Sequence, residues 1–232
     1  MIRFSDSESA LEIIYPDISA DNFKDIKPVG SITESDSQHF WENFFNNLER
    51  LNDIDEEMFA EVYGRSEDEF TFDFDVNDSD ISEQIELFSP EKWLVLKEAE
   101  KKEVIANTAK TIGDKLGVEN IPEVEFYEAD KHDCGAFCPN RNVISVNSNN
   151  FDNPQEILDT IAHEMRHAYQ FQRTQDPQEE MDYLYAYNFE NYITPCVMDD
   201  GYVNFTDYQD QLIESEARAF ANLFNLEDGS DE

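Results

Sequence analysis

Two histidines and a glutamate lie within five consecutive residues of this chain. The segment from His163 to His167 reads HEMRH, inside a stretch that Asn153-Pro154 opens as a helix running to about Gln172. Histidines four residues apart lie one helical turn apart on the same face, so both imidazoles can reach one Zn²⁺ ion. Glu164 lies at the edge of that face and is the expected general base, taking a proton from the attacking water.

The direction in which the two histidines point from their helix indicates whether they pack in the hydrophobic core or form a binding site. At about 100° per residue, His163 and His167 point away from the apolar stripe of their own helix. The stripe consists of Ile157, Leu158, Ile161, Met165, Ala168 and Tyr169. The two histidines therefore face either water or a cleft covered by another element. The alternative is a pair of ordinary helix histidines.

A zinc site of this kind needs a third protein ligand, and the last predicted helix, Gln209 to Asn225, offers two glutamates. Glu216 lies in the middle of its apolar face, whereas Glu214 falls among polar residues. An ionised carboxylate in an apolar face is costly unless a cation compensates it. Zinc would be such a cation, and Arg166 is the alternative partner in a site without metal. We therefore expect Glu216, rather than Glu214, to complete the metal site.

The elements around these residues predict an α+β fold. A helix from Ser89 to about Lys115 is followed by a short strand, Val124–Tyr127, and by a hairpin within Gly135 to Asn147 whose second strand, Val143–Val146, could be an edge strand. A helix is also expected over Met181–Tyr192. Upstream, residues 39–51 have helical spacing and residues 70–76 alternate like a strand. We place a boundary near residue 88, between an acidic N-terminal region of unknown role (1–88) and a metallopeptidase-like domain (89–232).

The motif pair resembles that of a known family. HEMRH followed by Glu216, Ala217, Phe220 and Ala221 resembles the gluzincin peptidases, and most of all the ImmA/IrrE-like group. The resemblance covers about residues 90–226. It implies a zincin-like fold with zinc bound by His163, His167 and Glu216, and with Glu164 as the catalytic residue. The long, Tyr-rich stretch between the motifs and residues 1–88 have no counterpart in it, and no helix-turn-helix module is evident.

Charge limits the partners. The chain has 16 basic and 54 acidic residues, a net charge of −38 spread evenly along 232 residues. Such a surface should repel nucleic acid and anionic membranes and could attract a basic protein. No stretch approaches the roughly 20 apolar residues of a membrane span, and no secretory signal is evident, so a cytoplasmic protein is expected.

Three cysteines imply no disulfide framework. His132, Cys134 and Cys138 could form a second metal site, but no fourth ligand follows at a standard spacing. A hairpin with semi-buried thiols is the preferred interpretation.

The sequence thus predicts a zinc-dependent peptidase acting on a peptide or protein substrate, with Zn²⁺ as cofactor. The alternative is a catalytically silent zincin fold that binds a basic partner or mimics nucleic acid. A toxin or effector peptidase of a mobile element would share the chemistry of the first. The group that stabilises the oxyanion stays open among Tyr185, Tyr187, Tyr192, Tyr202, Tyr208 and Arg218.

Overall fold

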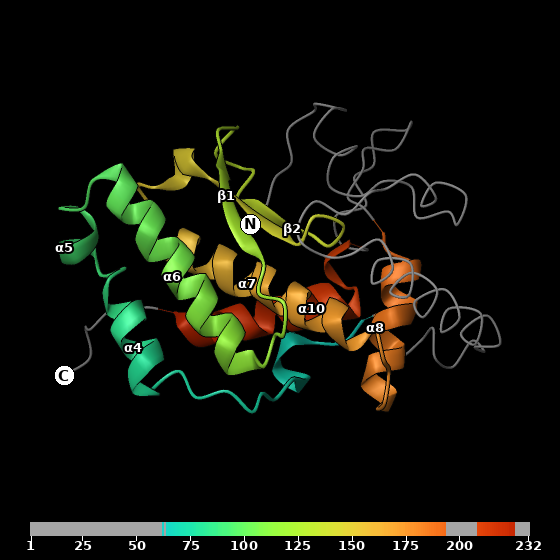
Figure 1. Ribbon diagram of the computed structural model, residues 1–232. Helices are drawn as coiled ribbons and strands as arrows, with labels where there is room; N and C mark the ends of the chain where they lie inside the picture. The colour runs from blue at the N-terminus through green and yellow to red at the C-terminus, as the bar shows by residue number, and fades with distance from the viewer. Residues whose placement is uncertain (1–61, 63, 194–207, 226–232) are drawn as a thin grey trace.

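A computed structural model describes residues 62, 64–193 and 208–225 of the chain. They form an α+β fold in which a small sheet lies against a layer of helices (Figure 1). The helix expected over residues 39–51 and the hydroxyl of Tyr202 lie outside the described residues. Among those described, no helix is long and apolar enough to cross a membrane.

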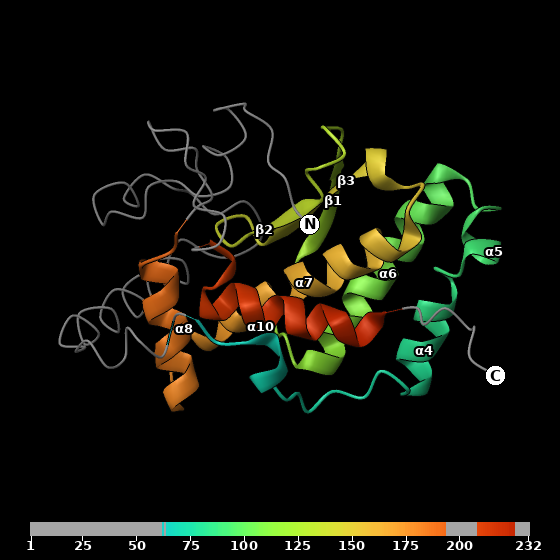
Figure 2. The same ribbon diagram turned by 180° about the vertical axis from the view of Figure 1, so that it is seen from behind.

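The central element is α7 (Pro154–Arg173), which carries the HEMRH motif. It begins as predicted, with Pro154 in the first turn and the Asn153 side chain accepting the backbone N–H of Glu156. It lies between α6 (Glu98–Leu116) and α10 (Leu212–Ala221), as the two opposite views show (Figures 1 and 2). Helix α8 (Glu180–Glu190) packs against both α7 and α10. The side of α7 that bears the histidines is therefore covered by other elements.

The sheet contains β1 (Glu123–Tyr127), β2 (Gly135–Cys138) and β3 (Val143–Asn147), in the order β1-β3-β2. Strand β3 pairs in parallel with β1 and antiparallel with β2. The expectation that Val143–Val146 forms an edge strand is therefore wrong, because β1 occupies its second side. In the described part of the chain, β2 is the edge beside α7.

Gly135 permits the close approach of β2 to its neighbours. A Cβ atom at this position would lie 2.5 Å from the carbonyl oxygen of Ser145 and 2.7 Å from Cγ2 of Thr160, distances that real side chains do not tolerate. Thr160 lies one turn before the histidine motif. The glycine thus allows the edge strand to lie directly against the helix that carries the motif.

The helix expected from Ser89 to about Lys115 is interrupted. It consists of α5 (Pro90–Trp93) and α6, separated by residues 94–97, with Leu94 and Val95 exposed. The buried Trp93 indole donates to the backbone oxygen of Phe151 at 2.7 Å and stacks on Phe88, which anchors the first turn away from the axis of α6. Gly117 ends α6 in the left-handed conformation, as its position predicts.

Residues 72–88, assigned from the sequence to the N-terminal region, contribute side chains to the same core as the residues that follow. Helix α4 (Ser79–Glu86) contributes Ile81 to this core, and Phe88 lies next to it. Residues 70–76 alternate between half-buried and exposed side chains as predicted, but they form no strand. Instead, Phe72 and Phe74 pack edge-on against Phe220 of α10. Alternation fixes only which side chains face inward, and here the surface they meet is a helix.

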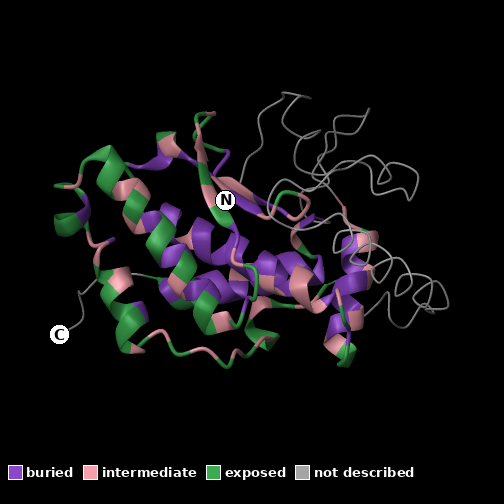
Figure 3. Ribbon diagram, viewed as in Figure 1, coloured by how far each residue is buried: buried purple, intermediate pink, exposed green. Residues whose placement is uncertain are grey.

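Burial is concentrated at the interface of α7 and α10 (Figure 3). At this interface both helices are buried around most of their circumference. The buried residues of each helix include polar ones. Buried polar side chains require partners, and the candidate site is found among them.

Candidate metal centre

The two histidines converge on one point. The ring centroids of His163 and His167 are 4.6 Å apart with nearly perpendicular planes, and their Nε2 atoms are 3.0 Å apart. Both side chains are buried, at 7% and 5% exposure. The nitrogen atoms that could bind a metal therefore face each other inside the protein.

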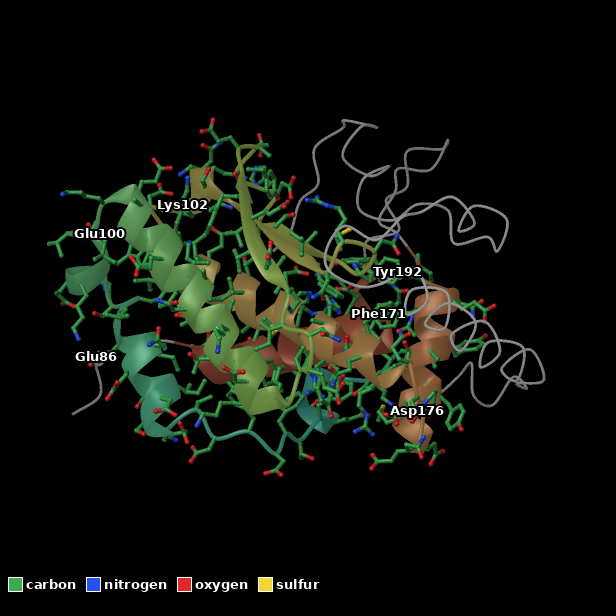
Figure 4. All side chains as sticks on the ribbon, viewed as in Figure 1. Glu86, Glu100, Lys102, Phe171, Asp176 and Tyr192 are labelled. Carbon is green, nitrogen blue, oxygen red and sulfur yellow. The ribbon has the colours of Figure 1, made fainter. Side chains whose placement is uncertain are left out.

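Glu214 of α10 completes the group. Its carboxylate oxygens lie 3.4 Å from Nε2 of His163 and 3.5 Å from Nε2 of His167. The side chain is 1% exposed, and its Oε2 atom is buried without a hydrogen-bond partner. Tyr192, which lies just beyond the end of α8 (Figure 4), donates its hydroxyl to Oε1 at 2.6 Å. These three residues are the group with metal-ligand spacing in the described part of the chain.

Electrostatics couple the three groups tightly. Burial alone would raise the pKa of Glu214, but His167 and His163 outweigh it and hold that pKa well below its ordinary value. Burial would lower the pKa of His167, but Glu214 and, to a smaller extent, Glu164 raise it to about 9. The cluster thus presents a carboxylate that strongly favours its ionised form next to a nearby positive charge.

The geometry of the group is suited to holding a metal ion. Bonds of about 2.0–2.1 Å to a tetrahedral zinc place neighbouring ligand atoms roughly 3.3 Å apart. Here the two imidazole nitrogens are 3.0 Å apart, Oε2 of Glu214 lies 3.4 Å from that of His163, and Oε1 of Glu214 lies 3.5 Å from that of His167. Two imidazoles and one carboxylate are also a donor set typical of catalytic zinc, and the unsatisfied Oε2 of Glu214 is an acceptor that a cation would satisfy.

Glu164 is held by the edge strand. Its Oε2 atom accepts the backbone N–H of Phe137 in β2 at 2.7 Å, and the side chain is 5% exposed. It lines the same pocket as His163 and Glu214 and lies close enough to His167 to affect its pKa. Glu164 therefore lies beside the histidine pair, at the position expected from the sequence.

The position of Glu216 corrects the sequence analysis. Its carboxylate does not face the histidines but accepts hydrogen bonds from Arg166, Tyr185 and Gln170, each at 2.6 Å. The salt bridge with Arg166 is the alternative raised from the sequence. Glu214, which had been assigned to the polar side of the helix, takes the position expected of Glu216.

The helical wheel failed because α10 has no solvent-facing side at this level. Residues 212–217 are all buried, so the polar side of the helix lies against another element rather than water. That element is the polar side of α7, which carries the histidines. The signal for Glu214 was present: histidines that point away from their own apolar stripe must meet the polar side of a covering helix.

A pocket of about 220 Å³ opens beside the cluster. It runs between the N-terminal half of α7 and the C-terminal half of α10, and Glu67 also lines it. Its acidic lining also includes Glu156 and Asp159, which the sequence analysis had not singled out. Burial raises the pKa of Asp159. Arg218 lines the pocket as well, but its guanidinium is engaged by Glu67 at 2.7 Å.

The tyrosines proposed as oxyanion donors fall into two groups. Tyr192 contacts Glu214 and Tyr208 lines the pocket, so both lie at the cluster. Tyr185 instead donates to Glu216, and Tyr187 packs in the small core beneath α8. Among the described candidates, Tyr208 and Arg218 line the pocket, whereas Tyr192 contacts Glu214 from outside its lining.

The three residues considered for a second metal site differ in their exposure to solvent. The ring of His132 is exposed next to Asp130, whereas the buried thiol of Cys134 donates to Glu156 at 3.2 Å. Burial, reinforced by Glu156, raises the pKa of Cys134 to about 12. Cys138 is a free, buried thiol on β2. The two thiols thus serve as small buried side chains of the hairpin.

Comparison of the chain with models of protein families, with curated proteins and with solved structures finds no match.

Proposed function

We propose that this protein is a zinc-dependent peptidase of the gluzincin type, with zinc bound by His163, His167 and Glu214 and with Glu164 as general base. The observation that carries the proposal is the convergence of two imidazole nitrogens and one buried carboxylate with an unsatisfied oxygen, whose ligand atoms lie within 4.8 Å of one another. The resemblance of the motifs to the ImmA/IrrE-like group supports it.

The chemistry follows from the position of Glu164. A zinc ion bound at this site would supply Lewis-acid activation of a water molecule and of the scissile carbonyl. Glu164 accepts a proton from the attacking water and passes it to the nitrogen of the leaving amine, so the carboxylate is regenerated. The N–H of Phe137 fixes one oxygen of Glu164, which orients the carboxylate for both transfers.

Two features favour a peptide as the substrate. The edge strand β2 lies directly beside α7, and the edge of a sheet can pair with an extended peptide. The pocket next to His163 is large enough for one side chain of such a peptide. A substrate paired with β2 would cross the cluster with one side chain directed into this pocket.

The test combines metal analysis with one substitution. We expect about one zinc per chain in the purified protein. The wild type should cleave unfolded protein substrates, and Glu164→Gln should keep zinc but lose hydrolysis, because an amide cannot accept the proton. Absence of any bound transition metal after zinc addition would contradict the proposal, as would normal turnover by the variant.

The net charge of −38 supports a second function, the silent fold that binds a basic protein or mimics nucleic acid. The same experiment separates the two. A binding protein would hold its basic partner equally well as the wild type and as the Glu164→Gln variant, and it would show no turnover in either form. A peptidase loses turnover with the single amide substitution.

A further inference from the structure

Gln170 connects the candidate metal site to Glu216. It lies on α7 one turn after His167, and it is completely buried. Its Oε1 atom lies 2.8 Å from Nδ1 of His167. Its Nε2 atom donates to the backbone oxygen of Ile213 at 3.0 Å and to Oε2 of Glu216 at 2.6 Å. All the hydrogen-bonding atoms of this amide thus have partners.

These partners fix the direction of the amide. A backbone carbonyl and a carboxylate can only accept hydrogen bonds, so both must face the NH₂ group of Gln170. The oxygen of the amide must then face His167. Because this oxygen can only accept, the Nδ1 atom of His167 carries a proton. Its Nε2 atom is left as the one that faces His163 and Glu214.

Glu216 is held as a carboxylate by the other side of the interface. Arg166 and the hydroxyl of Tyr185 each donate to its Oε1 atom at 2.6 Å, and all three side chains are buried. The ion pair therefore keeps Oε2 of Glu216 available as an acceptor for Gln170.

We propose that Glu216 and Gln170 are positioning residues for the metal site, acting in series: ionised Glu216 orients Gln170, and Gln170 holds the proton of His167 on Nδ1. The Nε2 lone pair of His167 is thereby directed to the point shared with His163 and Glu214. This inference rests on the proposed function for the identity of the ligand, zinc. Glu216 thus acts on the site through two intermediates and does not touch the metal.

The decisive variant is Glu216→Gln. Its amide oxygen must face Arg166, which can only donate, so its NH₂ group turns toward Gln170. To avoid two facing NH₂ groups, the amide of Gln170 rotates to present its oxygen to residue 216 and its own NH₂ to His167. This rotation also sets the amide oxygen against the backbone oxygen of Ile213, which adds to the cost of the substitution. Nδ1 must now accept instead of donate. We expect zinc affinity, measured by competition with a chelator, to fall about 10- to 100-fold, as for other outer-shell partners of ligating histidines.

A spectroscopic measurement distinguishes positioning from general damage. Nitrogen-15 shifts of the His167 ring, measured in the metal-free protein above the pKa of about 9 that Glu214 gives this ring, should show a protonated Nδ1 in the wild type and an unprotonated Nδ1 in Glu216→Gln. Tyr185→Phe is the matched control, since it removes a donor to Glu216 from the same buried network but leaves the carboxylate. It should lower the melting temperature yet keep both the Nδ1 proton and the zinc affinity.

A swapped pair tests the direction of the series. In the double variant Gln170→Glu with Glu216→Gln, residue 170 accepts from both Nδ1 and the new amide. The proton then returns to Nδ1, and zinc affinity recovers relative to Glu216→Gln alone.

The proposal is overturned if Glu216→Gln keeps a protonated Nδ1 and wild-type zinc affinity. Should Glu216→Gln fail to fold, Gln170→Met must lower zinc affinity in a folded protein. A wild type that binds no zinc refutes the proposed function, while the ring shifts still decide the series.

Discussion

The interface of α7 and α10 contains two glutamates, two residues apart, whose surroundings are opposite in kind. Glu214 and Glu216 are equally removed from water, at 1% and 4% exposure. Glu216 meets a guanidinium, a hydroxyl and an amide, all donors. Glu214 meets two imidazole nitrogens and retains an oxygen without a hydrogen-bond partner.

The difference shows that burial alone does not identify a functional carboxylate. The charge of Glu216 is matched by Arg166, whose guanidinium also lies over the rings of Phe72 and Tyr169, so this side of the interface is closed and neutral. The side of Glu214 faces a pocket and is neutral only while a proton or a cation is shared with the histidines. A structural ion pair and a candidate metal site thus lie within one turn of each other at the interface of the same two helices.

The largest expected effect distinguishes the two glutamates by metal binding. Glu214→Gln should lower zinc affinity on the order of 1,000-fold or more, equivalent to about 4 kcal/mol, because the site loses its one charged ligand. Glu216→Gln, its matched control, should lose less, since it acts through Gln170. Zinc titration of both variants in parallel measures this. A larger loss at residue 216 than at residue 214 would reverse the assignment of ligand and support.

On the closed side, Arg166→Met should lower the free energy of unfolding by about 3–5 kcal/mol, because Glu216 is left as a buried charge without its cation. The measurement is urea unfolding of the metal-free protein. In the control, the double variant Arg166→Met with Glu216→Leu, the buried charge is gone as well. It should be more stable than Arg166→Met alone. If the double variant is the less stable of the two, the ion pair is not what Glu216 requires.

The sequence predicted most elements of this fold because their signals are local. Asn153-Pro154 starts α7, Gly117 ends α6, and the turn near Asn142, with its positive φ of 50°, closes the hairpin. The HEMRH motif is also local, since one helical turn fixes the relation of His163 to His167. These features need no knowledge of what packs against them.

What the sequence could not predict depends on contacts between distant elements. The helical wheel assigned Glu216 to a ligand position because it assumed that the polar side of α10 faces water. Likewise, nothing local shows that β1 pairs with β3 and leaves β2 at the edge, or that residues 70–76 pack on Phe220. In each case the deciding fact is the identity of the neighbouring surface.

A smaller effect concerns an ion pair at the far end of α7. Asp182 of α8 accepts from Arg173 at 2.6 and 2.9 Å and from the backbone N–H groups of Gln178 and Glu179. Asp182→Asn should cost about 2 kcal/mol in unfolding free energy, as expected for hydrogen bonds to a charged group. Urea unfolding at neutral pH measures the cost.

The pH dependence of that cost has a defined sign. Burial would raise the pKa of Asp182, but Arg173 and the two backbone donors hold it below 3.8. Its contribution to stability is therefore present above that ordinary value and is lost as the pH falls through the lowered pKa. The difference between wild type and Asp182→Asn should shrink in acid. A difference that stays constant down to the acid limit of the folded state would contradict this.

The smallest expected effect concerns the open side of the interface and the substrate of the proposed peptidase. Asp159 and Glu156 line the pocket on successive turns of α7, and the guanidinium of Arg218 is already engaged by Glu67 and by the backbone oxygen of Gln209. A zinc ion would balance Glu214 and Glu164 but not these two carboxylates. The pocket therefore favours a positively charged side chain, and an incoming ammonium group would lower the pKa that burial raises at Asp159.

Peptides that differ only in lysine or norleucine at the position entering the pocket test this preference. The wild type should have the higher kcat/KM for lysine, and Asp159→Asn should reduce the ratio by up to about tenfold, equivalent to about 1.4 kcal/mol. Glu103→Gln, an equal change of charge on the exposed side of α6, should leave the ratio unchanged. Equal ratios in wild type and Asp159→Asn would show that the pocket charge does not select the substrate. A reduced ratio in both variants would assign the preference to the acidic surface as a whole, since long-range attraction depends on net charge rather than on which carboxylate carries it.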